Sequence, residues 1–313
     1  MTDLTSPDPS PGTGDAPAST GRRTLAGRTL LMSGGSRGIG LEIALRAAED
    51  GANVVLLAKT DTPDPRLPGT VHTAVDAIEQ AGGRGLAVVG DVRNDEDVQR
   101  AVGAAVERFG GVDIVVNNAS AINLADTDSV DMKRYDLMQD INARGTFLLS
   151  KTAIPQLSAA AVVHGAAHIL TLSPPLNLDP RWAGAHLAYT MAKYGMSLTT
   201  LGLAHELAER NIAVNSLWPA TMIDTAAIRN MPGGERLASR SRKPRIVAEA
   251  AHAILTRDAS YTGHFALDEE VLGEEGITDF TAYNVGEAEQ PRIRDEFLES
   301  APGYVSIMEA LGA

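Results

Sequence analysis

Short apolar runs recur along the chain from about Thr29 onward. They are rich in Val, Ile and Leu and mostly continuous, which is typical of strands that are buried on both faces. The pattern predicts strands over residues 29–33, 53–58, 85–92, 112–119, 167–173, 212–219 and 264–269.

Helix-like segments separate these runs. Residues 40–51 end in a glycine suited to a helix C-cap, and residues 94–110 begin with Asn and acidic residues, which suit a helix N-terminus. Repeated alternation of strand and helix predicts an α/β fold with a doubly wound parallel sheet. We therefore expect a Rossmann fold of about seven strands in a single domain.

The two ends of the chain differ from this pattern. Residues 1–23 are rich in Pro, Ser, Thr, Gly and Asp, which predicts a disordered tail. The catalytic domain is expected over 24–285, and residues 286–313 are expected to pack on or near the substrate side. Residues 222–245 have weak apolar periodicity, so they form either a mobile lid over a site or a surface helix and loop.

Composition excludes several classes of function. The formal net charge is -13, and so acidic a surface repels phosphate backbones, which argues against nucleic acid as a partner. The sequence has no cysteine, so disulfides, thiolate nucleophiles and Cys-ligated zinc are excluded, and no metal site is expected. No apolar run approaches about 18 residues, and the N-terminus lacks the apolar core of a signal peptide, so membrane insertion is not expected and a cytoplasmic location is the default.

A glycine-rich loop, SGGSRGIG, follows the first predicted strand and opens the first predicted helix. Small residues let the backbone approach a pyrophosphate, and the helix N-terminus offers free N–H groups to the anion. The alternative is a tight turn that binds nothing. The motif predicts a dinucleotide site built from Ser33, Gly34, Ser36, Arg37, Gly38, Ile39 and Gly40.

The end of the second strand bears on which dinucleotide binds. An NAD enzyme normally carries Asp or Glu there for the ribose 2′-hydroxyl, whereas this chain has Lys59. Together with Arg37, Lys59 favours a 2′-phosphate and hence NADP (NADPH), unless both are solvated surface charges diluted by Asp61 and Asp64. Asp91, which ends the third strand, could accept from the adenine amine or be an ordinary strand-end residue.

Tyr189 and Lys193 stand four residues apart in a predicted helix and so share one face. A phenol titrates near pH 10, and a neighbouring ammonium brings it closer to a useful range for proton transfer. The same lysine can hold the nicotinamide ribose. The alternative is a partly buried Tyr beside a solvated Lys.

Six motifs follow one another along the chain, namely SGGSRGIG, GDV (90–92), NNAS (117–120), Asn142 in INARG, Tyr189 with Lys193, and WPAT (218–221). Together they resemble the short-chain dehydrogenase/reductase family, and more narrowly its hydroxysteroid dehydrogenase-like protein 2 group, from about Leu25 to Val285. In animal members of that group a sterol-carrier domain follows, and this chain is expected to lack it.

The resemblance implies a role for each catalytic residue. Tyr189 would be the general acid/base, Lys193 would lower its pKa and bind the ribose, and Asn142 would hold a water in a proton relay. Asn142 could instead be a helix N-terminal cap. Along the cofactor, the resemblance implies contacts from Asp91, Val92, Asn118, Ala119, Pro219 and Thr225, although Thr225 could be only a cap or turn residue.

The fifth strand ends in a way that departs from the family. Members usually end it in a Ser-Ser pair, whereas here Ser173 is followed by Pro174 and Pro175. The prolines could re-aim the Ser173 hydroxyl toward the substrate carbonyl, or Ser173 could merely close the strand while another donor acts. The prolines, Arg181 and Trp182 are expected to shape one wall of the substrate pocket.

The expected activity is an NADP(H)-dependent hydride transfer between nicotinamide and a carbonyl or alcohol carbon of a small, apolar substrate. The alternatives are a cofactor-binding scaffold or regulator with little turnover, and a lyase or epimerase that reuses bound nicotinamide. The family's helices around Asn142 and Tyr189 usually pair subunits, so a homotetramer or homodimer is expected.

Overall fold

A computed structural model describes residues 23–64, 69–287, 291–295 and 297–311 of the chain. The disordered tail predicted over residues 1–23 lies outside the described residues except for Arg23.

The strands are β1 (Thr29–Ser33), β2 (Asn53–Ala58), β3 (Arg84–Val89), β4 (Ile114–Asn117), β5 (Ala167–Thr171), β6 (Ile212–Trp218), β7 (Phe265–Leu267), β8 (Arg292–Ile293) and β9 (Tyr304–Val305). The α-helices are α1 (Gly38–Glu49), α2 (Val71–Gln80), α3 (Asp95–Phe109), α4 (Met132–Met138), α5 (Gly145–His164), α6 (Pro180–Ala185), α7 (Leu187–Leu207), α8 (Ala226–Arg229), α9 (Gly234–Ser239), α10 (Arg245–Leu255), α11 (Asp268–Glu274) and α12 (Ile307–Leu311). A π-helical segment, η1 (Gln139–Arg144), joins α4 to α5, and two 3₁₀ turns are η2 (Ala208–Arg210) and η3 (Thr281–Tyr283).

The first seven strands form one parallel sheet in the order β3-β2-β1-β4-β5-β6-β7. This confirms the predicted doubly wound fold. Successive residues of β1 face opposite sides, since Leu30 and Met32 join one buried core and Leu31 joins the other. The small parallel pair β8-β9 near the C-terminus was not predicted.

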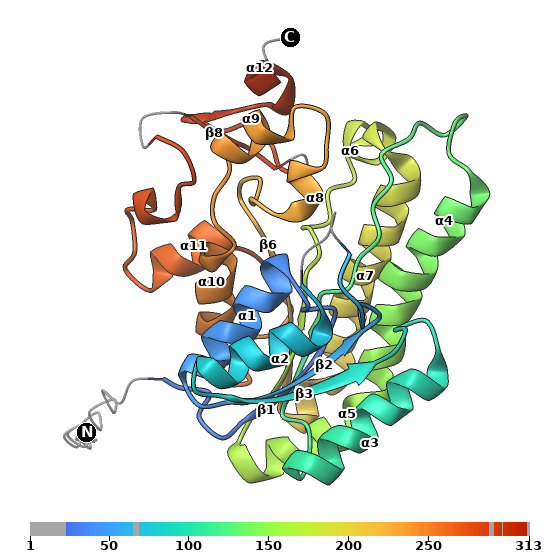
Figure 1. The fold of residues 1–313 in the computed structure, drawn as a ribbon, viewed down its shortest axis with the longest axis vertical. Coiled ribbons are helices and arrows are strands. Elements are labelled where there is room, and N and C mark those ends of the chain that lie inside the picture. Colours follow the sequence, from blue (N-terminus) through green and yellow to red (C-terminus); the bar gives the residue numbers. More distant parts are fainter. Residues whose placement is uncertain (1–22, 65–68, 288–290, 296, 312–313) are drawn as a thin grey trace, which may run out of the picture.

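Helices cover both faces of the sheet (Figure 1). Helices α1, α2, α10 and α11 pack on one face, and α3, α5 and α7 pack on the other. The strand order reverses between β1 and β4. In open α/β sheets ligands bind at the carboxyl ends of the strands beside this switch point.

Local signals explain where helix α3 begins and ends, close to the predicted bounds. The Asn94 side chain accepts a hydrogen bond from the N–H of Asp97, and three acidic residues occupy the first turn. Gly110 ends the helix with φ of 90°, a left-handed conformation that favours glycine.

One helical run in the described part of the chain, Met132–His164, has the length and apolar composition that would let it cross a membrane. Core helices of water-soluble proteins pass the same test. In this run Leu149, Ala153 and Leu157 are fully buried in the core beneath the sheet, whereas Phe147, Val162 and Val163 are exposed.

Candidate active site

A cleft of about 500 Å³ opens at the carboxyl ends of β1, β2 and β4. Most of the residues predicted to bind a dinucleotide line it. They are Gly34, Ser36, Arg37, Gly38, Ile39, Lys59, Asp91, Val92, Asn118, Ala119 and Thr225.

Ser33 and Gly40 were also predicted to bind the cofactor, but they are not among the residues that line the cleft. The Ser33 hydroxyl accepts a hydrogen bond from the Ala119 N–H at 3.2 Å, and its carbonyl accepts from the Asn118 amide at 3.3 Å. A Cβ at Gly40 would lie 2.5 Å from the Asn118 amide nitrogen. Ser33 and Gly40 therefore hold the glycine loop against the segment after β4.

The glycine loop fits a dinucleotide pyrophosphate. Helix α1 begins after Arg37 without a side-chain capping hydrogen bond, so N–H groups of its first turn remain for an anion. Gly34 and Gly38 have φ of 78° and 59°, which other residues rarely adopt. A Cβ at Gly34 would also lie 2.6 Å from the Asn118 amide nitrogen, so only glycine allows this close packing.

Arg37 and Lys59, the two cations predicted to contact a ribose 2′-phosphate, both line this cleft. The Arg37 guanidinium donates to the Thr60 hydroxyl at 2.9 Å and to the Gly69 carbonyl at 3.2 Å. The Lys59 ammonium is 3.0 Å from a carboxylate oxygen of Asp91. Lys59 therefore forms an ion pair with Asp91, and the spacing of these residues in the sequence alone did not reveal this pair.

Asp91 is held in its ionised form. Burial by itself raises the pKa of Asp91, but hydrogen bonds from Arg93 and Lys59 outweigh burial and keep the pKa below its usual range. An adenine amine at Asp91 would therefore meet a carboxylate that already accepts two cationic donors.

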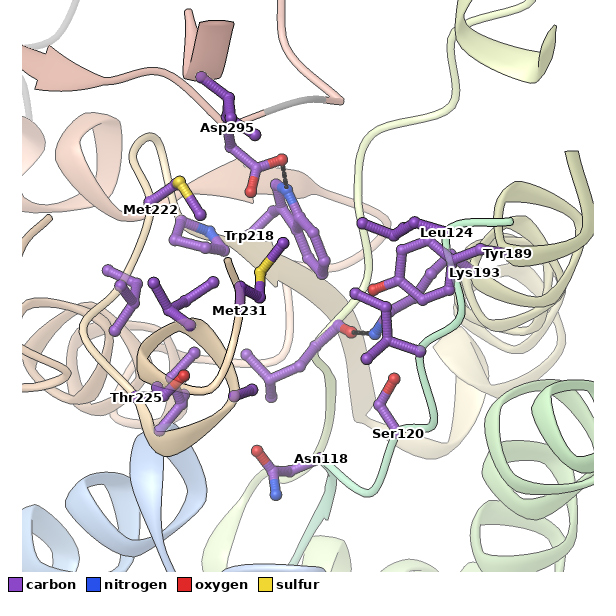
Figure 2. A pocket seen from close by; sticks show the side chains of 18 residues that line it. Asn118, Ser120, Leu124, Tyr189, Lys193, Trp218, Met222, Thr225, Met231 and Asp295 are labelled. Atoms are coloured by element: carbon purple, nitrogen blue, oxygen red, sulfur yellow. Dashed lines mark hydrogen bonds between the residues drawn. The ribbon is translucent and has the colours of Figure 1, made fainter. Parts of the chain in front are cut away.

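A second cavity, of about 280 Å³, adjoins the cleft. Figure 2 shows the side chains that line this second cavity. The two share the lining residues Ile39, Asn118, Ser120, Thr225 and Ala227. The rest of its wall is mostly apolar. Its apolar part consists of Ile122, Leu124, Leu172, Trp218, Pro219, Met222, Ile223, Ile228, Met231 and Ile307, and its polar part of Tyr189, Lys193 and Asp295. Pro219, predicted to contact the cofactor, therefore lines this apolar cavity and not the dinucleotide cleft.

Tyr189 and Lys193 project from α7 into the wall of this cavity, as their spacing predicted. Both are buried, so the interpretation of Lys193 as a solvated lysine is wrong. The Lys193 ammonium donates to the Leu172 carbonyl at 2.9 Å and lies 5.0 Å from the Trp218 ring centroid. Burial lowers the pKa of Lys193 to about 7, and the negative charge of Asp295 opposes this effect.

Asn142 is fully buried within the continuous helical run, so the interpretation as a helix N-terminal cap is wrong. Its amide donates to the Ala121 carbonyl at 3.0 Å and accepts from the Ala121 N–H at 2.8 Å. Asn142 thus fixes the segment after β4, and its role in a water relay stays a prediction.

The structure does not bring Ser173 to the cavity. Strand β5 ends at Thr171, and Leu172 is the residue whose side chain lines the cavity and whose carbonyl meets Lys193. The Ser173 N–H donates to the Thr171 carbonyl at 3.0 Å, so the chain turns tightly at Leu172, and Ser173 is fully buried with its hydroxyl 2.8 Å from that of Ser216. The geometry therefore opposes the catalytic assignment of Ser173 and favours the alternative that it only closes the strand.

Two other expectations about the cavity wall have opposite outcomes. Four residues were expected to shape the substrate pocket but are not among its lining residues, namely Pro174, Pro175, Arg181 and Trp182. Residues 222–245, in contrast, supply Met222, Ile228 and Met231 to the lining, so this segment covers the cavity instead of standing apart as a surface helix and loop.

Several site residues were missed by the sequence reasoning. Ser120 and Trp218 lie within motifs that were noted, NNAS and WPAT, but were given no role. Asp295 and Ile307 reach the cavity from the C-terminal extension, where no local pattern marks them. Phe297 packs its ring 5.8 Å from that of Tyr189, so this extension contacts the reactive residues directly.

The chain is similar to known proteins over most of its length. The profile of the short chain dehydrogenase family matches residues 28–234. The hydroxysteroid dehydrogenase-like protein 2 of Danio rerio is 52% identical over 290 residues, which is 92% of this chain and 68% of that protein.

Solved structures show the same fold. A short chain dehydrogenase from Mycobacterium thermoresistibile is 48% identical, with a TM-score of 0.84 over 90% of this chain and 100% of that chain. An NADH-dependent reductase, A1-R′, complexed with NAD, is 25% identical, with a TM-score of 0.62 over 78% of this chain and 95% of that chain.

The chain belongs to the short-chain dehydrogenase family, and its class is that of an oxidoreductase. Within that family it is similar to the hydroxysteroid dehydrogenase-like protein 2 group, as the sequence motifs predicted.

Proposed function

We propose that this protein is an NADP(H)-dependent reductase or dehydrogenase that interconverts a carbonyl and an alcohol. The observation that carries the proposal is the placement of Tyr189 and Lys193 in an apolar cavity continuous with the glycine-loop cleft. A substrate in the cavity would lie beside both a proton donor and a dinucleotide.

The chain's own residues account for the proton. When bound, the nicotinamide supplies a hydride to the carbonyl carbon. The Tyr189 hydroxyl gives its proton to the carbonyl oxygen, and the positive charge of Lys193 stabilises the phenolate that remains. The reverse reaction returns that proton to Tyr189 as the alcohol is oxidised.

The preference for NADP over NAD is supported by Arg37 and Lys59 at the edge of the cleft. A 2′-phosphate there would compete with Asp91 for Lys59 and with the Thr60 hydroxyl for Arg37. The related A1-R′ reductase is NADH-dependent, so the fold by itself does not imply NADP, and the proposal depends on these two cations.

The substrate class follows from the cavity wall. Apolar side chains from the segment after β4, from residues 222–231 and from α12 surround the space near Tyr189. They favour a small apolar ketone or aldehyde and exclude water from the developing charge.

A screen of apolar aldehydes and ketones that follows NADPH absorbance tests this function. Consumption that requires both substrate and protein is the expected result. The withdrawal of Ser173 from the cavity favours the competing scaffold function, which would bind NADPH and reduce no carbonyl. A lyase or epimerase would convert substrate without net NADPH consumption.

We further propose that the chain forms a homodimer or homotetramer through α5 and α7. These helices expose Phe147, Met191, Leu198 and Leu201 with between 48% and 57% of each residue accessible. Such apolar surface is typical of a subunit interface. Light scattering on wild type and on Leu198→Glu tests this proposal, because a charged residue in the interface should dissociate the oligomer. A monomeric wild type would refute it.

The proposed location of the protein is cytoplasmic, which cell fractionation can test.

A further inference from the structure

The proposed reaction lacks one expected group. The carbonyl oxygen gains negative charge as hydride arrives, and a second hydrogen-bond donor beside Tyr189 normally stabilises it. Ser173 cannot serve in this geometry, because its hydroxyl is buried against Ser216. Pro174 and Pro175, which follow it, have no backbone N–H to offer.

Three hydroxyl groups line the cavity in the described part of the chain, those of Ser120, Tyr189 and Thr225. Thr225 lies across the cavity from Tyr189 (Figure 2). Ser120 lies on the same side as Tyr189 and Lys193, and its hydroxyl points toward them (Figure 2). Ser120 also borders the dinucleotide cleft, so it stands where the two spaces meet.

Hydrogen bonds on both sides hold Ser120 in place. The N–H of Ala119 donates to the Ser33 hydroxyl at 3.2 Å. Both backbone groups of Ala121 bond to the buried Asn142 amide, at 2.8 and 3.0 Å. A donor on a fixed backbone needs little reorganisation when charge develops, which is the condition for effective oxyanion stabilisation.

We propose that Ser120, and not Ser173, supplies the catalytic hydroxyl that donates a hydrogen bond to the substrate carbonyl oxygen. The proposal rests on the reductase function above. In the reduction, the carbon gains the hydride, the oxygen gains the Tyr189 proton, and the C=O π bond becomes the new O–H bond. Ser120 keeps its own proton throughout.

Ser120→Ala tests this against Ser173→Ala, which serves as a matched control. Loss of one oxyanion donor should lower kcat by about 10²–10³-fold in Ser120→Ala. NADPH affinity and melting temperature should stay close to those of wild type. Ser173→Ala should keep kcat within about fivefold of wild type, and Ser120→Thr should recover most of the activity because it restores a hydroxyl.

A second readout does not depend on turnover. An aliphatic primary amide offers a carbonyl oxygen but is not reduced, so its affinity for the NADPH-loaded protein can be titrated by calorimetry. We expect several-fold weaker binding to Ser120→Ala and unchanged binding to Ser173→Ala. The proposal is overturned if the amide binds equally well to wild type, Ser120→Ala and Ser173→Ala, or if it binds to none of them.

The kinetic outcomes distinguish a failure of the Ser120 proposal from a failure of the proposed reductase function. A wild type that reduces carbonyls while Ser120→Ala remains within fivefold of it overturns the role of Ser120 alone. A loss confined to NADPH affinity also overturns it, since Ser120 would then contact only the cofactor. If no carbonyl is reduced by wild type but amide binding still depends on Ser120, the reductase function fails while the carbonyl contact stands.

Discussion

Trp218 donates its indole N–H to the Asp295 carboxylate across 2.7 Å, and the face of the same ring lies 5.0 Å from the Lys193 ammonium. One aromatic side chain thus connects an acid of the C-terminal extension to the lysine of the proposed acid/base pair. The Trp218 ring also packs nearly perpendicular to that of Phe297, with centroids 5.7 Å apart. The C-terminal extension therefore sets part of the electrostatic surroundings of Lys193.

The first prediction concerns Asp295→Asn. The negative charge of Asp295 raises the pKa of Lys193, so the neutral amide should lower that pKa further below its present value of about 7. The limb of the kcat/KM profile that reports Lys193 deprotonation should therefore move to lower pH.

Glu299→Gln is a suitable control for Asp295→Asn, because it removes one charge from the same segment at an exposed side chain outside the cavity. The control should leave the pH profile in place. An unmoved limb in Asp295→Asn would show that Asp295 does not act on Lys193.

The second prediction concerns Tyr189→Phe, which removes the transferable proton but keeps a ring of the same shape against Phe297. Turnover should fall by about 10²-fold or more, while NADPH binding changes little. Fluorescence titration and steady-state kinetics check the two halves. Wild-type turnover in the variant would exclude Tyr189 as the acid.

The third prediction concerns cofactor choice. Two charge-assisted contacts from Arg37 and Lys59 to a 2′-phosphate should give at least about tenfold tighter binding of NADPH than of NADH. Lys59→Ala should reduce this ratio mainly by weakening NADPH, because NADH lacks the phosphate. Equal affinities for the two cofactors in wild type would disprove the assignment.

Much of the fold follows from local sequence patterns. The apolar runs at 29–33 and 53–58 coincide with β1 and β2, because each run is mostly continuous and is followed directly by a glycine or a polar residue. The helical period places Tyr189 and Lys193 on one face wherever α7 packs. These features need only neighbours in the sequence.

The parts that could not be predicted depend on where a segment ends or on distant contacts. The fifth strand was predicted to run to Ser173, whereas it ends at Thr171 and the chain turns at Leu172, which leaves Leu172 on the cavity and Ser173 buried against Ser216. The contact of Trp218 with Asp295 spans 77 residues, and no local pattern announces it. The C-terminal part of the cavity is visible only in three dimensions.

The last prediction concerns Asp268, which is fully buried at the start of α11. One of its carboxyl oxygens accepts from the N–H groups of Ala220 and Glu269, each at 2.8 Å. The other oxygen has no hydrogen-bond partner among the described residues. Burial raises the pKa of Asp268 from 3.8 to about 7, against the opposing effect of the Ala220 hydrogen bond.

The raised pKa of Asp268 determines how the free energy of unfolding changes with pH. The folded state holds the Asp268 proton more tightly than the unfolded state, so the free energy of unfolding falls as pH rises from about 4 to about 7. The difference between the two pKa values corresponds to about 4 kcal/mol at most.

Asp268→Asn keeps an oxygen for both N–H donors but cannot ionise. Its melting temperature relative to wild type should therefore increase through this pH range and level off above it, whereas Asp128→Asn, at an exposed position, should show no such trend. A difference between Asp268→Asn and wild type that stays constant from pH 4 to pH 8 would mean that Asp268 does not titrate in this range.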